Sequence, residues 1–381
     1  MGYKKDFPAA KKITYFDSAA LVLKPKISID AVLNYYQNIS ISSRTADTPL
    51  GNLVNSTINS VREKVAQLID AQKHEVIFTS GTTESLNYIA NMLNSIITQD
   101  HEILLSSYNH SSHIIPWIEL AQKKQAKVII KEDLINAITP KTKIIALAQE
   151  TNNFKQVQDI QAIYQKAEQV GAYVINDCAQ SILHQKCSLT NSHVIAFSCN
   201  KFYGPTGMGV LAIQQNLLKQ LKPTKFGGGS VNEINTNQTW TIKDTIAKFE
   251  PGTPNLAGFF MFDKSLDYFN NIGYETTQKV LGDLSIYLHN RLNKLKNVEV
   301  FSNPGDYIAL INVKNINAQD VATYLGIKGI YTIAGIFCAH YLRNIKSNYS
   351  YLRISLGIYN TKKDIDKLIY HLKNGGDFYG F

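Results

Sequence analysis

The stretch that decides the fold is Ser198-Cys199-Asn200-Lys201-Phe202-Tyr203-Gly204-Pro205-Thr206-Gly207. The apolar run 194–197 before it predicts a buried strand, whose polar end carries Ser198 and Lys201 into a turn rich in Gly and Pro. A second apolar run, 208–213, leads away from the turn. A lysine at the end of a strand is well placed for covalent chemistry, but most lysines are solvated surface residues, so Lys201 alone leaves both interpretations open.

Strand and helix patterns alternate along the chain before this stretch. Short apolar runs predict strands at 75–79, 103–105, 128–130, 144–148 and 172–175, and amphipathic helices such as 57–71 lie among them. The alternation predicts an α/β protein with a largely parallel sheet that is covered on both faces. Ligands of such sheets bind at the carboxyl ends of the strands. The residues at those ends are Thr79, Ala148, Asp177 and Ser198.

The pattern changes after Gly229. Residues 232–241 are polar and predict a surface loop or hairpin, and a long helical segment over 255–295 leads into a shorter α+β region that ends in a helix at 363–372. A chain of 381 residues exceeds the roughly 250–300 residues that a single core usually serves. We therefore predict a large domain over 20–258 and a small domain made of 1–19 and 259–381.

Composition narrows the class of protein. The net charge of +9 is spread over scattered lysines with no dense basic block, so we expect no nucleic-acid partner. The four cysteines form no CxxC pair, which is typical of reduced thiols in a cytoplasm. No apolar segment reaches the roughly 18 residues of a membrane span, and no signal-peptide core follows the first residues. The sequence predicts a cytoplasmic protein without a membrane partner.

Three features are ambiguous when each is taken alone. Asp177 ends a buried strand and needs a cationic partner, which could be a structural lysine or a ligand. The segment Ser80-Gly81-Thr82-Thr83 either caps a helix or holds a phosphate at the helix N-terminus. His110 lies in a polar run after a strand, where it is either solvent-exposed or stacked on a flat cofactor.

Nine motifs occur in a characteristic order. They are Asp17-Ser18-Ala19-Ala20, the segment 78–84, His110 with the segment 114–117, Asn176-Asp177-Cys178-Ala179-Gln180, the segment 197–207, Phe226-Gly227-Gly228-Gly229, the segment 250–255, Cys338-Ala339, and the segment 353–361. In this order the chain resembles pyridoxal-phosphate enzymes of the class V aminotransferase family, and more narrowly the SUF-type (group II) cysteine desulfurases. The resemblance runs from about residue 7 to the last helix and implies the type I pyridoxal-phosphate-dependent transferase fold and a homodimer.

The resemblance also implies roles for individual residues. Lys201 would bond the pyridoxal 5'-phosphate and carry a proton at the substrate Cα, and Asp177 would keep the pyridine nitrogen protonated. His110 would stack on the ring, and Arg353 would hold the substrate carboxylate. The remaining cofactor contacts would come from Asn152 and Gln180 at the phenolic oxygen, from Thr82, Thr83, Ser198 and Asn200 at the phosphate, and from Thr253 of the second subunit. No metal is implied.

Cys338 defines the reaction that the resemblance implies. Among apolar neighbours a cysteine is more often a small buried residue than a nucleophile. Cys338 nevertheless lies 15 residues before Arg353, which is the group II spacing. By resemblance its thiolate attacks the sulfur of cofactor-bound cysteine, which leaves a persulfide on Cys338 and releases L-alanine.

The chain departs from the family pattern near these residues. Asn200 stands where the family has histidine, and Ile333-Ala334-Gly335-Ile336-Phe337-Cys338 stands where the family has Arg-Thr-Gly-His-His-Cys. Ser43-Arg44 replaces a His-Arg pair, and the segment 152–156 replaces an Asn-x-x-Gly-Thr turn. The cofactor-binding set is retained, whereas thiolate activation and docking of a sulfur acceptor are the functions these changes affect.

The sequence therefore predicts a cysteine desulfurase that uses L-cysteine and passes sulfur to an acceptor protein for iron–sulfur cluster or thio-cofactor assembly. Alternatives within the family are a selenocysteine lyase or another class V lyase or aminotransferase, in which Cys338 would be dispensable. A catalytically weakened scaffold of the same fold is a further alternative, which the altered neighbours of Cys338 suggest.

Overall fold

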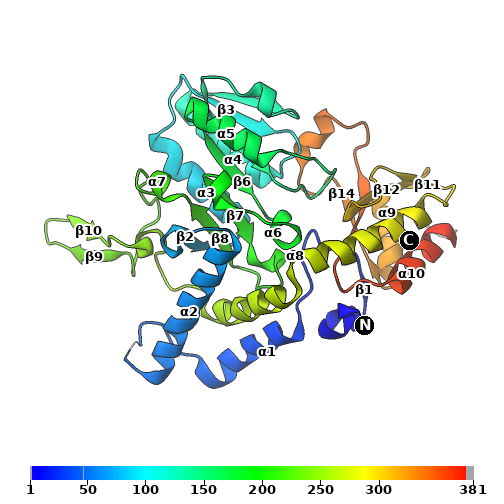
Figure 1. Ribbon diagram of the computed structural model, residues 1–381, viewed down its shortest axis with the longest axis horizontal. Coiled ribbons are helices and arrows are strands. Elements are labelled where there is room, and N and C mark those ends of the chain that lie inside the picture. The colour runs from blue at the N-terminus through cyan, green and yellow to red at the C-terminus, as the bar shows by residue number, and fades with distance from the viewer. Residues whose placement is uncertain (1, 46, 375–381) are drawn as a thin grey trace.

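The structure is a computed structural model that describes residues 2–45 and 47–374. A seven-stranded sheet forms its centre (Figure 1). The strand order is β2-β8-β7-β6-β5-β3-β4, and β8 runs in the opposite direction to the other six strands. Its strands are β2 (Val76–Thr79), β3 (Glu102–Ser106), β4 (Lys127–Lys131), β5 (Thr142–Ala148), β6 (Tyr173–Asp177), β7 (Val194–Ser198) and β8 (Gly209–Ile213). The α/β class with a mainly parallel sheet is confirmed.

Helices cover both faces of this sheet, because its strands are apolar on both sides. Ile103 and Leu105 of β3 join one core with the helices α3 (Thr82–Met92) and α4 (Ile115–Lys124), while Leu104 joins a core on the opposite face with α5 (Ile160–Val170). That second face is extended by α2 (Pro49–Leu68) and α8 (Leu256–Leu292), which pack against β7 and β8. Shorter helices are α1 (Lys26–Asn34), α6 (Ser181–His184) and α7 (Gln215–Leu218).

A smaller antiparallel sheet follows near the C-terminus. Its order is β11-β12-β15-β14, and α9 (Ala318–Ile327) and α10 (Lys362–Asn374) accompany it. The strands are β11 (Val298–Val300), β12 (Ile308–Val313), β14 (Ile333–Gly335) and β15 (Tyr351–Ser355). Near the N-terminus, β1 (Thr14–Tyr15) pairs with β13 (Ile330–Tyr331), and Asp17 bridges to Ser355. The first residues therefore lie beside the small sheet.

Helix α8 connects the two sheets. Gly273 has φ 76° within it, a left-handed conformation that glycine adopts without a Cβ clash, and the helix changes direction there. Residues before this break pack with the large sheet, and later ones such as Leu288 and Leu292 pack with the small sheet in the same continuous core. The predicted domain limits at 19/20 and 258/259 stay a prediction.

Most predicted elements are confirmed, with some differences at their ends. The helix expected at 57–71 begins earlier, at Pro49, because the Thr48 side chain caps it by accepting from the Gly51 N–H at 3.2 Å. Within the predicted α+β region, residues 330–335 form two short strands, β13 and β14, rather than one. The polar segment 232–241 is a hairpin of β9 (Val231–Ile234) and β10 (Trp240–Ile242) that projects from the body of the molecule (Figure 1). Across the described residues, no helix is both long and apolar enough to cross a membrane.

Candidate active site

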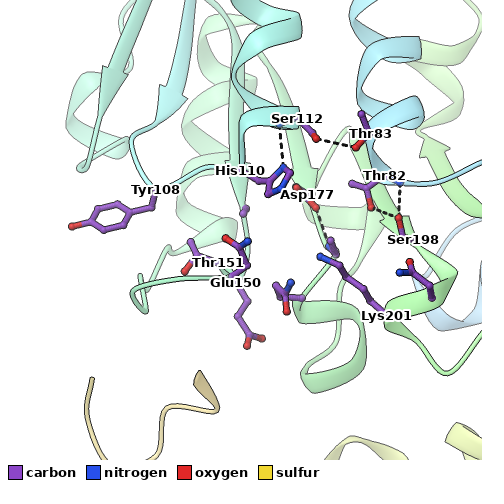
Figure 2. Close-up of a pocket in the computed structure, with 15 residues that line it drawn as sticks. Thr82, Thr83, Tyr108, His110, Ser112, Glu150, Thr151, Asp177, Ser198 and Lys201 are labelled. Atoms are coloured by element: carbon purple, nitrogen blue, oxygen red, sulfur yellow. Dashed lines mark hydrogen bonds between the residues drawn. The ribbon is translucent and has the colours of Figure 1, made fainter. Parts of the chain in front are cut away.

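One cavity opens at the carboxyl ends of the parallel strands. Its empty volume is about 600 Å³, open solvent at its mouth included. Nine of the ten residues predicted to bind a cofactor line it, and they come from the carboxyl ends of β6 and β7 and from the segments that follow β2, β3, β5, β6 and β7 (Figure 2). Those nine are Thr82, Thr83, His110, Asn152, Asp177, Gln180, Ser198, Asn200 and Lys201. The fold thus gathers side chains from the ends of five strands around one space.

Hydroxyl groups line the cavity at the N-terminus of α3. Ser198 Oγ accepts from the Thr82 N–H at 2.7 Å and lies 2.9 Å from Thr82 Oγ1, and Thr83 Oγ1 lies 2.8 Å from Ser112 Oγ (Figure 2). A Cβ on Gly209 would lie 2.5 Å from Gly81 Cα, so glycine lets β8 approach the turn that carries these groups. Hydroxyls at the N-terminus of an eleven-residue helix form a suitable site for a phosphate.

Lys201, in the short turn after β7, and Asp177, the last residue of the adjacent β6, line the same cavity. Burial lowers the pKa of Lys201 to about 8, while the nearby Asp177 carboxylate opposes this decrease. Asp177 is only 5 % exposed, and its Oδ1 accepts from the Ala179 N–H at 2.9 Å. A lysine with a lowered pKa beside a buried carboxylate can act as a nucleophile and as a proton carrier near neutral pH.

His110 ends the turn that follows β3. Its Nδ1 accepts from the Ser112 N–H at 3.1 Å, which fixes the ring at the cavity wall (Figure 2). Burial lowers the pKa of His110, and the Asp177 carboxylate opposes the decrease. The ring is therefore neutral at pH 7, as suits a flat surface against which another ring could stack.

Asn152 and Gln180 have protein partners in this structure. Asn152 Nδ2 donates to the Phe337 carbonyl at 2.7 Å, and Gln180 Nε2 donates to the Ala19 carbonyl at 2.8 Å. Both residues line the cavity, but these bonds also connect it to segments that are distant in sequence. Asn200, the predicted replacement for a histidine, lines the cavity one residue before Lys201.

Cys338 is the exposed cysteine of the chain, whereas Cys178, Cys187 and Cys199 are buried. Its carbonyl accepts from the Ser111 N–H at 2.7 Å, so Cys338 lies beside the residue that follows His110. The structure therefore places the predicted nucleophilic cysteine next to the cavity wall, although Cys338 does not itself line the cavity.

Arg353 and Thr253 lie outside the cavity lining. Arg353, 2 % exposed, donates to the Asn152 carbonyl at 3.0 Å and to Asp17 Oδ1 at 2.7 Å. Its guanidinium also lies 4.7 Å from the centre of the Phe337 ring. Thr253 is exposed and lines a different cavity with Lys225 and Glu250.

Several residues of the cavity wall are not among those predicted from the sequence. They are Tyr108, Ser112, Glu150, Thr151 and Ala179. Each follows the carboxyl end of a strand that the sequence predicted. Its position just after that strand was the feature that could have indicated a place in the cavity wall. Among residues 2–45 and 47–374, no three His, Cys, Asp or Glu side chains gather in an arrangement that could hold a metal ion.

Comparison with known proteins identifies the class of protein that this fold and site define. Residues 14–368 match the Aminotransferase class-V family, and the chain belongs to that family. A "Probable cysteine desulfurase" of Ureaplasma parvum is 33 % identical over 391 residues, which cover 97 % of this chain and 96 % of that protein. A "Probable cysteine desulfurase" of Staphylococcus aureus is 31 % identical over 401 residues, with 99 % and 97 % of the two chains covered.

Two solved structures have the same fold. The cysteine desulfurase CsdA of Escherichia coli, in its S-sulfonic acid form, superposes with a TM-score of 0.90 at 29 % identity and covers 97 % of this chain and 96 % of its own. The apo cysteine desulfurase of Thermococcus onnurineus gives a TM-score of 0.92 at 25 % identity with the same coverage. The expected type I pyridoxal-phosphate-dependent transferase fold is confirmed by these likenesses.

Proposed function

We propose that this chain is a pyridoxal-phosphate-dependent cysteine desulfurase. In the net reaction, L-cysteine and the Cys338 thiol give L-alanine and a Cys338 persulfide: the substrate C–S bond breaks, an S–S bond forms, and the substrate Cβ gains the hydrogen. The sulfur atoms are oxidised and the carbon is reduced, so no outside oxidant is needed. The observation that carries the proposal is the placement of the exposed Cys338 beside the cavity that contains Lys201 and Asp177.

The residues of the cavity fit pyridoxal 5'-phosphate. Thr82, Thr83 and Ser198 offer hydroxyls at a helix N-terminus for its phosphate, with Asn200 beside them, and the Asp177 carboxylate is suited to its protonated ring nitrogen. His110 would cover the ring, and Asn152 and Gln180 would approach its phenolic oxygen. When bound, the cofactor supplies a carbonyl for the substrate amine and withdraws electrons from the substrate Cα.

The chain's own groups would perform the proton and sulfur transfers. With a pKa of about 8, Lys201 changes between its neutral and charged forms near physiological pH and would move the proton at the substrate Cα. The Cys338 thiolate would attack the substrate sulfur, because the thiolate and not the thiol is the nucleophile. His110 would contact the cofactor ring, and the neighbouring Ser111 donates to the Cys338 carbonyl. Together they would hold the cysteine segment beside the ring.

Arg353 would bind the substrate carboxylate. Its Nε has no hydrogen-bond partner among the described residues, although the side chain is 2 % exposed. An unpaired buried N–H is costly, so a substrate carboxylate would satisfy it. Asp17 and the Asn152 carbonyl hold the rest of the guanidinium in place.

The proposed partners extend beyond one chain. Thr253 lies away from the Lys201 cavity of its own chain, which supports a homodimer in which Thr253 reaches the phosphate of the other subunit. The persulfide would be passed to a sulfur-acceptor protein in the cytoplasm, for iron–sulfur cluster or thio-cofactor assembly. The spacing of 15 residues from Cys338 to Arg353 supports assignment to the SUF-type subgroup.

A second candidate is a family enzyme that releases sulfide or selenide without a persulfide, such as a selenocysteine lyase. The apolar, buried side chains of Ile336 and Phe337 favour it, because they stand directly before Cys338 and offer its sulfur no cationic partner. The same feature would suit a weakened scaffold.

Formation of alanine from L-cysteine separates these functions. We expect wild type to form alanine, Lys201→Ala to form none, and Cys338→Ala to lose at least about 90 % of the rate, since a removed nucleophile costs more than tenfold. Cys187→Ala, at a buried cysteine, is the control. Full alanine formation by Cys338→Ala would contradict the persulfide step. Pyruvate and sulfide formed in place of alanine would support the lyase, and no product from wild type would support the scaffold.

A further inference from the structure

The segment that carries Cys338 is held in an unfavourable backbone conformation. Phe337 and Cys338 both have φ of 56°, in the left-handed region that non-glycine residues rarely occupy. Each such residue costs energy and persists only where its surroundings fix it. The contacts that fix this segment therefore decide where the Cys338 sulfur lies.

Ser111 supplies two of those contacts. Its N–H donates to the Cys338 carbonyl at 2.7 Å, and its Oγ lies 2.8 Å from Nδ1 of His340. The two bonds hold the segment on both sides of Ala339, which is itself fully buried. Because Ser111 follows His110 directly, they join the cysteine segment to the wall of the cavity.

The other contacts of the segment act before Cys338. Asn152 Nδ2 donates to the Phe337 carbonyl, and the Ala339 N–H donates to the Ile336 carbonyl at 2.9 Å. Neither contact reaches the chain after Ala339. On the C-terminal side of Cys338, Ala339 and Leu342 pack against Tyr108 in a small buried cluster, and the exposed His340 adds a side-chain hydrogen bond to Ser111.

We propose that His340 is a positioning residue for persulfide formation: by bonding to Ser111 it holds Cys338 in its left-handed conformation toward the Lys201 cavity. This inference rests on the proposed desulfurase function. The imidazole with this role stands two residues after Cys338, whereas the residues directly before Cys338 are apolar. Two residues of chain span at most about 7 Å, so a displacement of His340 is transmitted directly to Cys338.

The test measures alanine formation from L-cysteine by His340→Ala, Ser111→Ala and the double variant. A lost hydrogen bond of this kind corresponds to about a fivefold to tenfold decrease in kcat. We expect this decrease in each variant, with KM for L-cysteine and cofactor affinity unchanged. Because both changes break the same bond, the double variant should be no slower than either single variant.

Two further variants separate positioning from a general structural effect. His340→Asn can still bond Ser111 through its side-chain oxygen and should recover activity to within about threefold of wild type. His74→Ala, at an exposed histidine on the turn before β2, should be unchanged. Alkylation of Cys338, which is exposed while the other thiols are buried, gives a readout that needs no activity: its rate should change in His340→Ala and return in His340→Asn.

The outcomes separate the role of His340 from the proposed desulfurase function. An active wild type with a fully active His340→Ala, or with additive single effects in the double variant, overturns the role of His340. Failure of His340→Asn to recover activity or alkylation also overturns it. A wild type that forms no alanine contradicts the proposed function instead, and the alkylation rates then still report whether His340 positions Cys338.

Discussion

Arg353 and Asp17, 336 residues apart in the chain, form a buried ion pair with 2.7 Å between Arg353 Nη2 and Asp17 Oδ1. The Arg353 side chain is 2 % exposed and that of Asp17 is 18 % exposed. The pair joins the N-terminal segment to β15 of the small sheet. It also fixes the guanidinium that we propose for the substrate carboxylate.

Removal of this partner should destabilise the protein. Asp17→Asn leaves the Arg353 charge buried and uncompensated, and we expect the free energy of unfolding to fall by about 3 kcal/mol. Chemical denaturation measures the change. Asp30→Asn breaks the exposed Lys26–Asp30 pair and serves as the control, with an expected loss below about 0.5 kcal/mol. Equal losses in the two variants would show that the Asp17 pair is not buried as described.

The cofactor should attach to Lys201 in a pH-dependent way. Only the neutral amine reacts with an aldehyde, and a pKa of about 8 makes Lys201 half neutral at that pH, whereas an ordinary lysine requires about pH 10.4. The rate at which pyridoxal phosphate becomes trappable by borohydride in the apoprotein should therefore rise with pH and level off above about pH 8. Continued increase toward pH 10, or trapping at another lysine, would contradict the assignment.

Lys24 supports the turn that carries Lys201. Its Nζ donates to the Asn200 carbonyl at 2.6 Å, and burial lowers its pKa to about 7. The unfolded chain binds a proton between pH 7 and about 10.4 that the folded chain does not, so this residue makes the protein more stable as pH rises through that range.

Substitution of Lys24 should remove that pH dependence. The stability of wild type relative to Lys24→Met should increase by about 2 kcal/mol from pH 7 to pH 9, as urea denaturation would show. Lys222→Met, at an exposed lysine, is the control and should track wild type at both pH values. A constant difference between wild type and Lys24→Met would mean that Lys24 titrates normally.

Mixed dimers test whether Thr253 acts across a subunit interface. The mixed dimer contains one Lys201→Ala chain and one Thr253→Ala chain. If each site combines Lys201 of one chain with Thr253 of the other, one site keeps both native residues and the other site carries both substitutions. We expect this mixture to recover wild-type cofactor affinity in one site per dimer, measured by titration with pyridoxal phosphate. If Thr253 acts within its own chain, every site that retains Lys201 carries the Thr253→Ala weakness and no intact site forms.

The sequence predicted the sheet and the position of the site because both depend on local patterns. The apolar run that became β7 and the polar residues after it placed Ser198 and Lys201 at a strand end. The ends of β2, β3, β5 and β6 and the turns after them then added Thr82, His110, Asn152 and Asp177 to the same cavity, as parallel strands require.

Contacts between distant segments could not be predicted in this way. Nothing local to Asn152 indicates that its amide donates to Phe337, 185 residues later, or that Arg353 pairs with Asp17. The Ser111–His340 bond is similarly a result of how the small sheet is placed beside the large one. The periodicity of apolar residues predicts where helices and strands lie. Contacts between residues distant in sequence depend instead on how whole helices and sheets pack against one another.

The most direct test of the account is to locate sulfur after a single turnover. Wild-type protein is mixed with L-cysteine, persulfides are capped with an alkylating agent, and peptides are analysed by mass spectrometry. We expect one added sulfur atom on the Cys338 peptide, with one alanine formed for each persulfide, and none on the buried Cys178, Cys187 or Cys199. Alanine formed while Cys338 gains no sulfur would contradict it.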